Sequence, residues 1–407
     1  MMKLSSKCLY CKGRYPERFC RSNVCPLYAR IDSLKRLEPK LAGENFDSSS
    51  RTPFVSRFGY PRISVGVLTP PGVSDAWEYD APRYWSSANY NIPKIVALRS
   101  SMVNSRFNAD VRTPSKYLAT TQEIAMSKRP VSLEVQLKNK PKLRLVLRPE
   151  LAPTGPSAKL KALTLTQNPR VPRAVERLVN DYDVKSIEAI AELSTRGLDE
   201  NYLTRLLSVG LLGTKPRRKL VPTRWAITAI DDTLGKQNLA KIKDFKLSEH
   251  LAFFGGYLGN YYIVLMLPAL FSYELFEMMA KEGEPSYVTD YEGYEGRHSY
   301  AENTAGGYYA ARLAVTEKLL EMKRQASVIV LRFITDEYSL PLGVWVVREA
   351  VRKALASKPI RFSDLELMLN YARIKAQKSF GVNIANLLKR SRLLDVHLHQ
   401  KNLKMFT

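Results

Sequence analysis

Motifs that mark several common enzyme classes are missing from this sequence. It contains no G-x-x-x-x-G-K-[ST] phosphate loop, no H-E-x-x-H metalloprotease motif and no G-x-S-x-G nucleophile turn. Histidine is also rare, because the chain has 407 residues and only four histidines, which are His250, His298, His397 and His399. These side chains are too scattered along the sequence to indicate a metal site. ATP-driven motors and the hydrolases that carry these motifs are therefore disfavoured.

Long apolar runs are missing as well. A transmembrane helix needs about 20 apolar residues, whereas the longest run here, from Tyr261 to Phe271, contains Pro268. Residues Met1 to Ser6 include no apolar signal segment, so we expect the chain to remain in a reducing cytoplasm. The sequence thus predicts a soluble cytoplasmic protein.

Acidic residues are in short supply relative to basic ones. The chain has 63 Lys and Arg against 39 Asp and Glu, which gives a formal charge of +24. Such an excess favours a polyanionic partner, and nucleic acid is the natural candidate because phosphate contacts release counterions. A basic surface of a thermophilic protein is the alternative explanation for part of the charge.

Cysteine is rare and confined to one end of the chain. All four cysteines, Cys8, Cys11, Cys20 and Cys25, lie within 18 residues and begin with a C-x-x-C pair. Four thiolates at this spacing fit a tetrahedral structural zinc site. Two disulfides are the alternative, but they are unusual in a reducing cytoplasm. The sequence therefore predicts one Zn²⁺ in a small module whose folding depends on the metal.

Patterns along the rest of the chain predict an α+β protein with a mixed sheet core and many helices. Alternation at Val131–Leu137 and again at 143–147, on either side of a turn at Pro141, predicts a β-hairpin. β-Branched residues predict strands at 57–68, 261–267 and 328–334. Helical patterns lie at 27–37, 92–102, 114–126, 269–281, 304–324 and 348–392. The small polar residues from Ala42 to Thr52 are typical of a linker.

The predicted organisation has five parts. They are a zinc module at 1–40, the N-terminal α+β part of the core at 53–170, a helical and basic segment at 171–233, the C-terminal α+β part of the core at 234–392, and a flexible tail at 393–407.

The helical and basic segment is a candidate DNA-binding element. Two short predicted helices, 184–193 and 201–207, precede a basic turn, an arrangement similar to a helix-turn-helix with a wing. The side chains predicted to contact phosphates are Lys215, Arg217, Arg218, Lys219 and Arg224. A helical hairpin that only packs, with a solvated basic loop, is the alternative.

A polar and aromatic loop at 287–303 concentrates acidic residues in an otherwise basic chain. The residues that could hold a divalent metal or supply acid and base are Asp290, Glu292, His298 and Glu302. These side chains could equally neutralise neighbouring lysines. Their spacing selects no mechanism, so an enzymatic role for the 287–307 region remains open.

The last eight residues contain the pattern Q-x-x-L-x-x-F, formed by Gln400, Leu403 and Phe406. One helical turn would place Leu403 and Phe406 on one face as a hydrophobic plug, while Gln400 would bind a separate pocket. The spacing is similar to the box (PIP motif) by which replication and repair proteins bind the DNA sliding clamp, PCNA. That box usually has a second aromatic residue where Thr407 ends this chain. The alternative is that both apolar side chains pack on the protein's own core.

Features at both ends and in the middle resemble the archaeal Nre family of DNA repair proteins over nearly the full length. The residues that carry the resemblance are the four cysteines, the stretches Arg57–Pro61 and Lys219–Trp225, and the terminal box. The resemblance implies a nucleoid-associated factor that repairs DNA damage together with the sliding clamp. Its DNA partner would be damaged or branched DNA. Two alternatives remain, namely a metal-dependent nuclease or nucleotide-processing repair enzyme, and an RNA-binding zinc protein.

The zinc site makes a direct prediction. Purified protein should contain one Zn²⁺ per chain, and Cys20→Ser should lose it and loosen about the first 30 residues, because metal binding supplies their folding energy. Atomic absorption and amide hydrogen exchange measure the two effects. Intact thiols without metal in the purified protein would contradict the site.

Overall fold

The computed structural model describes residues 11, 14–20, 25–41, 43–141 and 154–399. The chain divides into two compact units. The N-terminal unit comprises Met1–Leu234 with Leu340–Leu342, and the C-terminal unit comprises Gly235–Ser339 with Gly343–Thr407. Each unit combines helices with a six-stranded sheet, so the predicted α+β class is confirmed. None of the helices in the described parts of the chain is both long enough and apolar enough to span a membrane.

The sheet of the N-terminal unit has the order β1-β5-β6-β4-β3-β2. Its strands are β1 (Asn45–Ser50), β2 (Pro53–Val55), β3 (Arg62–Thr69), β4 (Val103–Asp110), β5 (Val131–Leu137) and β6 (Ser157–Leu165). The α-helices are α2 (Pro16–Cys20), α3 (Pro26–Leu37), α4 (Pro82–Ser87), α5 (Ile92–Ser100), α6 (Lys116–Met126), α7 (Arg173–Asn180), α8 (Ser186–Thr195), α9 (Glu200–Ser208) and α10 (Thr223–Ile242), the last of which continues into the other unit. Short 3₁₀ turns are η1 (Pro39–Leu41), η2 (Trp77–Asp80) and η3 (Lys215–Arg217).

The apolar side of this sheet forms the core of the unit. Alternation along β5 buries Val131, Leu133, Val135 and Leu137, as the period of two predicts. Strands β4 and β6 pair in parallel and the other neighbours pair antiparallel. Helix α6 adds Leu118 and Ile124 to the same apolar cluster, so helix and sheet share one core.

The predicted linker at 42–52 is wrong, because its residues 45–50 form strand β1, which pairs with β5. The strand is missed because it carries serines where apolar residues are expected. These serines are buried, and their hydroxyl groups donate to backbone carbonyl groups, Ser48 to Pro70 and Ser50 to Leu68, each at 2.7 Å. Satisfied hydroxyl groups can replace apolar side chains in a buried strand. The second strand of the predicted hairpin, 143–147, lies outside the described residues.

The C-terminal unit contains a sheet in the order β10-β9-β11-β8-β7-β12. Its strands are β7 (His250–Tyr257), β8 (Asn260–Leu267), β9 (Ser272–Met279), β10 (Tyr287–Glu292), β11 (Ser327–Ile334) and β12 (Ile360–Phe362). Its helices are α11 (Ala305–Met322), α12 (Trp345–Leu355), α13 (Leu365–Phe380), α14 (Ala385–Lys389) and α15 (Arg392–His399). Strand β11 lies between β9, which it pairs with in parallel, and β8, which it pairs with antiparallel.

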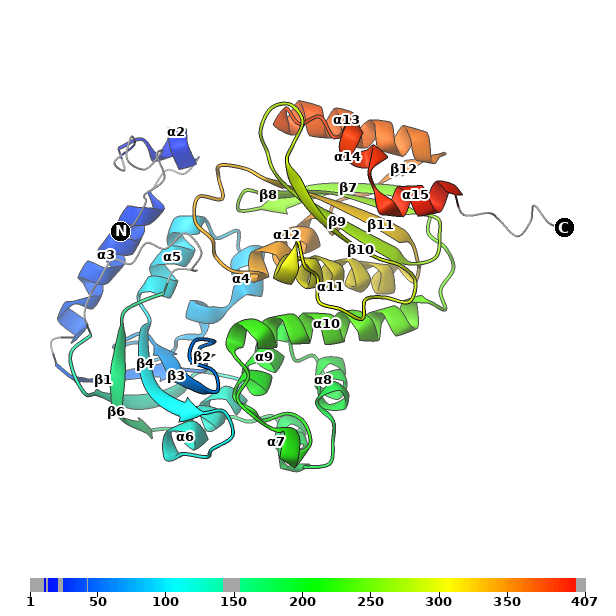
Figure 1. The fold of residues 1–407 in the computed structure, drawn as a ribbon. Helices are drawn as coiled ribbons and strands as arrows, with labels where there is room; N and C mark the ends of the chain where they lie inside the picture. The colour runs from blue at the N-terminus through cyan, green and yellow to red at the C-terminus, as the bar shows by residue number, and fades with distance from the viewer. Residues whose placement is uncertain (1–10, 12–13, 21–24, 42, 142–153, 400–407) are drawn as a thin grey trace. The chain divides into compact units, whose positions relative to one another are not determined.

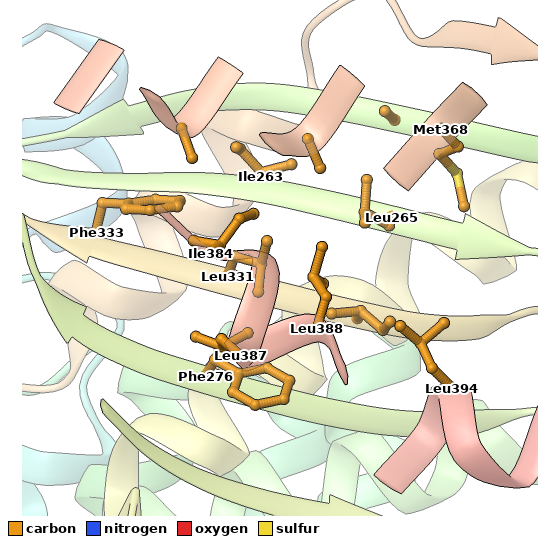
Figure 2. Packing of buried hydrophobic residues seen from close by; sticks show 14 of the residues in the cluster. Ile263, Leu265, Phe276, Leu331, Phe333, Met368, Ile384, Leu387, Leu388 and Leu394 are labelled. Carbon is orange, nitrogen blue, oxygen red and sulfur yellow. The ribbon is translucent and has the colours of Figure 1, made fainter. Parts of the chain in front are cut away.

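Helices cover both faces of this second sheet, with α11 and α12 on one side and α13 to α15 on the other (Figure 1). Figure 2 shows the core under α13 to α15, where apolar side chains of the sheet meet those of the helices. The labelled side chains are Ile263, Leu265, Phe276, Leu331 and Phe333 from the sheet, Met368, Leu387, Leu388 and Leu394 from the helices, and Ile384 from the position just before α14. Because both faces are covered, the central strands are apolar on both sides.

That double coverage explains a second error. The helix predicted at 269–281 is wrong, because the segment forms strand β9 between β10 and β11. Tyr273, Leu275, Phe276 and Met278 are buried on the two faces of the sheet. A strand buried on both faces has no clean period of two, so its apolar run can be mistaken for a helix.

Candidate nucleic-acid interface

The predicted basic segment lies on the surface of the N-terminal unit. Lys215, Arg217, Lys219 and Arg224 are exposed. Arg218 is different, because its guanidinium group donates to the carbonyl oxygens of Gly213, Val179 and Asp181 at 2.7 to 2.8 Å. Burial lowers the pKa of Arg218. This side chain therefore closes the basic turn onto the end of α7.

The two predicted short helices are present as α8 and α9. In a helix-turn-helix, the second helix must offer a face that enters the major groove. No residue of α9 is exposed, and seven of its nine residues are buried. The exposed side chains predicted to contact phosphates therefore lie in the turn and at the start of α10, whereas α9 packs in the core.

Two stretches far apart in the sequence meet beside this turn. The ring centroids of Tyr60 and Trp225 lie 5.6 Å apart, and the Val55 N–H donates to the Thr223 hydroxyl group at 2.9 Å. Gly59 shapes the turn before Tyr60, because its φ is +83° and a Cβ there would lie 2.7 Å from the carbonyl oxygen of Arg62. The contact brings the Arg57–Arg62 turn against the start of α10.

The result is an exposed surface that mixes rings and cations. We call it the aromatic–basic face, formed by Arg57, Phe58, Tyr60, Arg62, Arg224 and Trp225. Its three rings are 66%, 41% and 48% exposed for Phe58, Tyr60 and Trp225. Large exposed rings beside guanidinium groups are what single-stranded nucleic acids need, since bases stack on rings and cations contact phosphates. Sequence reasoning identified Arg224 but gave the three rings no role.

Two of the four predicted zinc ligands fall within the described residues as side chains. Cys11 is buried, and its sulfur accepts a hydrogen bond from the Tyr15 N–H at 3.4 Å. Cys25 precedes α3 and is half-buried. Cys8 and the side chain of Cys20 lie outside the described residues. The zinc site stays a prediction.

In the acidic loop, the Asp290 carboxylate is fully engaged in hydrogen bonds and an ion pair with the loop that precedes α11. Its carboxylate, on β10, accepts hydrogen bonds from the N–H groups of Asn303 and Thr304 at 3.0 and 2.7 Å and from the Thr304 hydroxyl group at 2.8 Å. Arg297 adds an ion pair at 3.3 Å. The carboxylate thereby holds the segment that leads into α11.

Glu292 forms a buried ion pair. Its Oε2 lies 2.9 Å from Nη1 of Arg312, and both side chains are 0% exposed. His298 and Glu302, in contrast, are exposed. Across the part of the chain that the structure describes, no three His, Cys, Asp or Glu side chains gather as they would around a metal ion. The four predicted catalytic residues therefore do not converge here on a metal-binding cluster.

The C-terminal box, Gln400, Leu403 and Phe406, lies outside the described residues. The helix before it, α15, has a defined anchor. The Glu274 carboxylate on β9 accepts from the Ser391 hydroxyl group at 2.5 Å and from the N–H groups of Arg392 and Leu393 at 3.1 and 3.0 Å. Burial raises the pKa of Glu274. A carboxylate at a helix N-terminus stabilises the helix, so α15 is fixed to the sheet.

These features define a basic α+β protein with a surface that suits a polyanionic ligand. Comparison with known proteins gives its family. Residues 19–284 match the family model described as Archaeal Nre, N-terminal, and residues 292–406 match Archaeal Nre, C-terminal. The chain belongs to the archaeal Nre family of DNA repair proteins, which confirms the resemblance found in the sequence.

Named relatives cover nearly the whole chain. DNA repair protein NreB of Archaeoglobus fulgidus is 35% identical over 394 residues, which is 95% of this chain and 97% of the relative. DNA repair protein NreA of Haloferax volcanii is 33% identical over 385 residues, 89% of this chain and 91% of the relative. NreA of Archaeoglobus fulgidus is 35% identical over 378 residues, which is 91% of this chain and 93% of the relative. No solved structure matches the chain.

The ion pair of Glu292 makes a testable prediction. Glu292→Ala should lower the free energy of unfolding by about 3–5 kcal/mol, because it removes the carboxylate that pairs with the buried Arg312. Glu302→Ala is the control, since it removes an exposed carboxylate from the same loop and should change that free energy by less than about 0.5 kcal/mol. Urea unfolding followed by circular dichroism measures both. Equal stability of the two variants would contradict the structural role of Glu292.

Proposed function

We propose that this protein is a DNA-damage repair factor that contacts DNA through basic surfaces and is recruited to the sliding clamp, PCNA, by its C-terminal peptide. Membership of a family of DNA repair proteins supports the first part. The observation that carries DNA contact is the aromatic–basic face, where exposed rings and guanidinium groups lie together. The net charge of +24 acts in the same direction at longer range.

The aromatic–basic face favours unpaired DNA over an intact duplex. A ring stacks on a base only when that base is accessible, and each such contact contributes about 1–3 kcal/mol. Arg57, Arg62 and Arg224 would contact the phosphates between the stacked bases. Exposed Lys215, Arg217 and Lys219 extend the positive charge along the neighbouring turn. Damaged or branched DNA, which exposes unpaired bases, is the ligand that fits this chemistry.

Clamp recruitment is supported by the placement of the box. Gln400 follows directly on α15, which ends at His399 and is held at its first turn by Glu274. The peptide therefore starts from a helix that is fixed to a folded unit. Tethering of this kind raises the local concentration of the repair factor at DNA even when each docking contact is weak.

A structural zinc ion completes the proposal. Zinc-bound thiolates need neighbouring donors to orient them, and the hydrogen bond from the Tyr15 N–H to Cys11 is such a contact. The ligands would be Cys8, Cys11, Cys20 and Cys25, with the metal ordering the N-terminal module and taking no part in chemistry.

An enzymatic role is the second candidate, but the acidic loop supports it weakly. Asp290 already accepts the Thr304 N–H before α11, and Glu292 already pairs with Arg312. Of the residues predicted to be catalytic, only His298 and Glu302 are exposed. An RNA-binding zinc protein would share the same charge, but it gives the C-terminal box no purpose.

The first test concerns the aromatic–basic face. Phe58→Ala should weaken binding of single-stranded oligothymidylate by about 5- to 150-fold, the equivalent of one stacked base, and should leave the salt dependence unchanged. Arg224→Ala should lower the slope of log affinity against log salt by about 0.7, the value for one phosphate contact. Fluorescence anisotropy across a salt series measures both quantities.

Tyr300→Ala is the control for this test, because Tyr300 is also an exposed ring, at 55%, but lies in the C-terminal unit. It should bind like the unchanged protein. If Phe58→Ala and Tyr300→Ala have equal affinities, base stacking on this face is wrong.

The second test concerns the clamp. Calorimetric titration with PCNA from the same organism should show binding by the full chain and none by a chain that ends at His399. Leu403→Ala and Phe406→Ala should each lose most of the affinity, because a few apolar anchors supply most of the energy of such a peptide. Lys401→Ala, at a position between the anchors, is the control and should retain it. Binding that survives removal of the tail would place the interface elsewhere.

A further inference from the structure

A second basic site lies in the N-terminal unit, between η2, α4 and α9. It is a pocket of about 270 Å³, and the residues of its lining that matter here are Arg51, Arg83, Lys128, Arg205, Trp77 and Tyr84. None of these side chains belongs to the aromatic–basic face. The lining also contains two carboxylates, Asp80 and Asp199, so the four cations outnumber the acidic side chains around the pocket.

Arg205 is the central residue of this pocket. It comes from the buried helix α9 and is 8% exposed. Its Nη1 donates to the carbonyl oxygen of Arg51 at 2.5 Å, which is the only hydrogen bond that its guanidinium group makes to the described residues. The ring of Tyr202 lies 4.7 Å from the guanidinium carbon. A guanidinium group has five N–H donors, so most of its donor capacity is left for a ligand.

The nearby carboxylates are already engaged with other groups. Asp199 accepts the Tyr202 N–H at 2.8 Å as the N-cap of α9. Asp80 pairs with Arg99 at 2.8 Å, and Glu200 pairs with Arg83 at 2.7 Å. None of these carboxylates lies within ion-pair distance of Arg205 in the described structure. Burial and then the neighbouring Arg51 lower the pKa of Arg205 to about 10, against smaller opposing effects of Tyr202, Asp80 and Asp199.

The rim of the pocket carries two exposed rings. Trp77 and Tyr84 are 38% and 42% exposed, and their centroids lie 4.7 Å apart in an edge-to-face arrangement. Arg51 fixes this rim, because its guanidinium group donates to the carbonyl groups of Trp77 and Lys128 at 3.3 and 3.2 Å. An aromatic rim above a buried cation matches a ligand with a phosphate at one end and a planar base at the other.

We propose that this pocket binds the phosphate monoester of a nucleotide, with the phosphate on Arg205 and Lys128 and the base on Trp77 or Tyr84. The planar guanidinium group suits two phosphate oxygens at once. Pockets that enclose a whole small-molecule ligand measure about 300–1,000 Å³. A pocket of 270 Å³ therefore holds the phosphate and part of the sugar while the base lies on the rim. The monoester is either the terminal phosphate of a DNA strand or a free mononucleotide.

This inference deepens the proposed function, because a strand with a terminal phosphate is what a nick or a broken end exposes. The inference rests on the proposed DNA binding only if the phosphate is the end of a DNA strand, and not if it belongs to a free mononucleotide. The aromatic–basic face would contact the bases of a strand, and the pocket would recognise how the strand ends.

The experiment compares ligands on the full-length protein by fluorescence anisotropy and calorimetry. The ligands are oligothymidylates with a 5′-phosphate, a 3′-phosphate or hydroxyl groups at both ends, together with thymidine monophosphate, its hydroxyl counterpart thymidine, and inorganic phosphate. At least one phosphorylated ligand should bind about tenfold more tightly than its hydroxyl counterpart, the effect of one well-formed contact. Preference for an oligonucleotide identifies a strand end, and equal binding of the mononucleotide identifies a free nucleotide.

Variants show whether the pocket causes the preference. Arg205→Met should abolish it, and because Arg205 is buried, the exposed residues Lys128 and Trp77 provide further variants that leave the core intact. Lys128→Ala should reduce the preference for phosphorylated ligands about threefold. Trp77→Ala should weaken the binding of nucleotides but not the binding of inorganic phosphate. Lys138→Ala, which removes an exposed lysine elsewhere in the same unit, is the control and should change nothing.

Two results would overturn the inference. They are equal binding of phosphorylated and hydroxyl ligands, and a preference that survives Arg205→Met and Lys128→Ala. Either result leaves the proposed DNA contact intact if Phe58→Ala still weakens the binding of the oligonucleotides. Conversely, a phosphate preference shown only by the mononucleotide, with no oligonucleotide binding, would remove the proposed DNA contact and keep the pocket.

Discussion

The C-terminal unit depends on the position of one strand, β11. It pairs over its full length with β9 on one side and with β8 on the other, although both of those strands come earlier in the chain. The N-terminal family match ends at residue 284, after β9, and the C-terminal match begins at residue 292, before β11. The sheet is therefore completed only when both matched regions are present. Strands β7, β8 and β9 need β11 from the C-terminal match to complete their sheet, so the C-terminal unit draws its strands from both matched regions.

Buried charge serves mainly as structural support in this basic protein. Glu274 holds the first turn of α15, Asp290 holds the start of α11, and Glu292 pairs with Arg312 between β10 and the same helix. Each carboxylate sits on a strand and each partner belongs to a helix or the loop before it. A buried carboxylate is costly unless it is fully paired. The contacts of Asp290 and Glu274 therefore fix where α11 and α15 begin, and the Glu292 ion pair holds the middle of α11 to β10. The scarcity of acidic residues thus makes their positions informative about the fold.

The sequence predicted regular elements well and long-range contacts poorly. Strands β3, β5, β8 and β11 and helices α5, α6 and α11 follow from local periodicity, which is set by the face that each element buries. Strand β1 escaped because buried serines replaced apolar residues, and β9 because its two buried faces removed the alternation. The candidate interface shows the same limit. Arg224 could be recognised from local charge, but Tyr60 meets Trp225 only through the fold, and no spacing in the sequence encodes that contact.

The two basic sites of the N-terminal unit differ in solvation, and this difference assigns them different tasks. On the aromatic–basic face the guanidinium groups are exposed, so water and salt weaken each contact and binding is adaptable to many sequences. Arg205 is 8% exposed, so its interaction with an anion acts at lower effective dielectric and is stronger, but the empty site costs stability because burial removes part of the water around the cation. A fold retains such a residue when the bound anion offsets that cost. A desolvated cation therefore suits recognition of one defined phosphate, and a solvated cluster suits the rest of a strand.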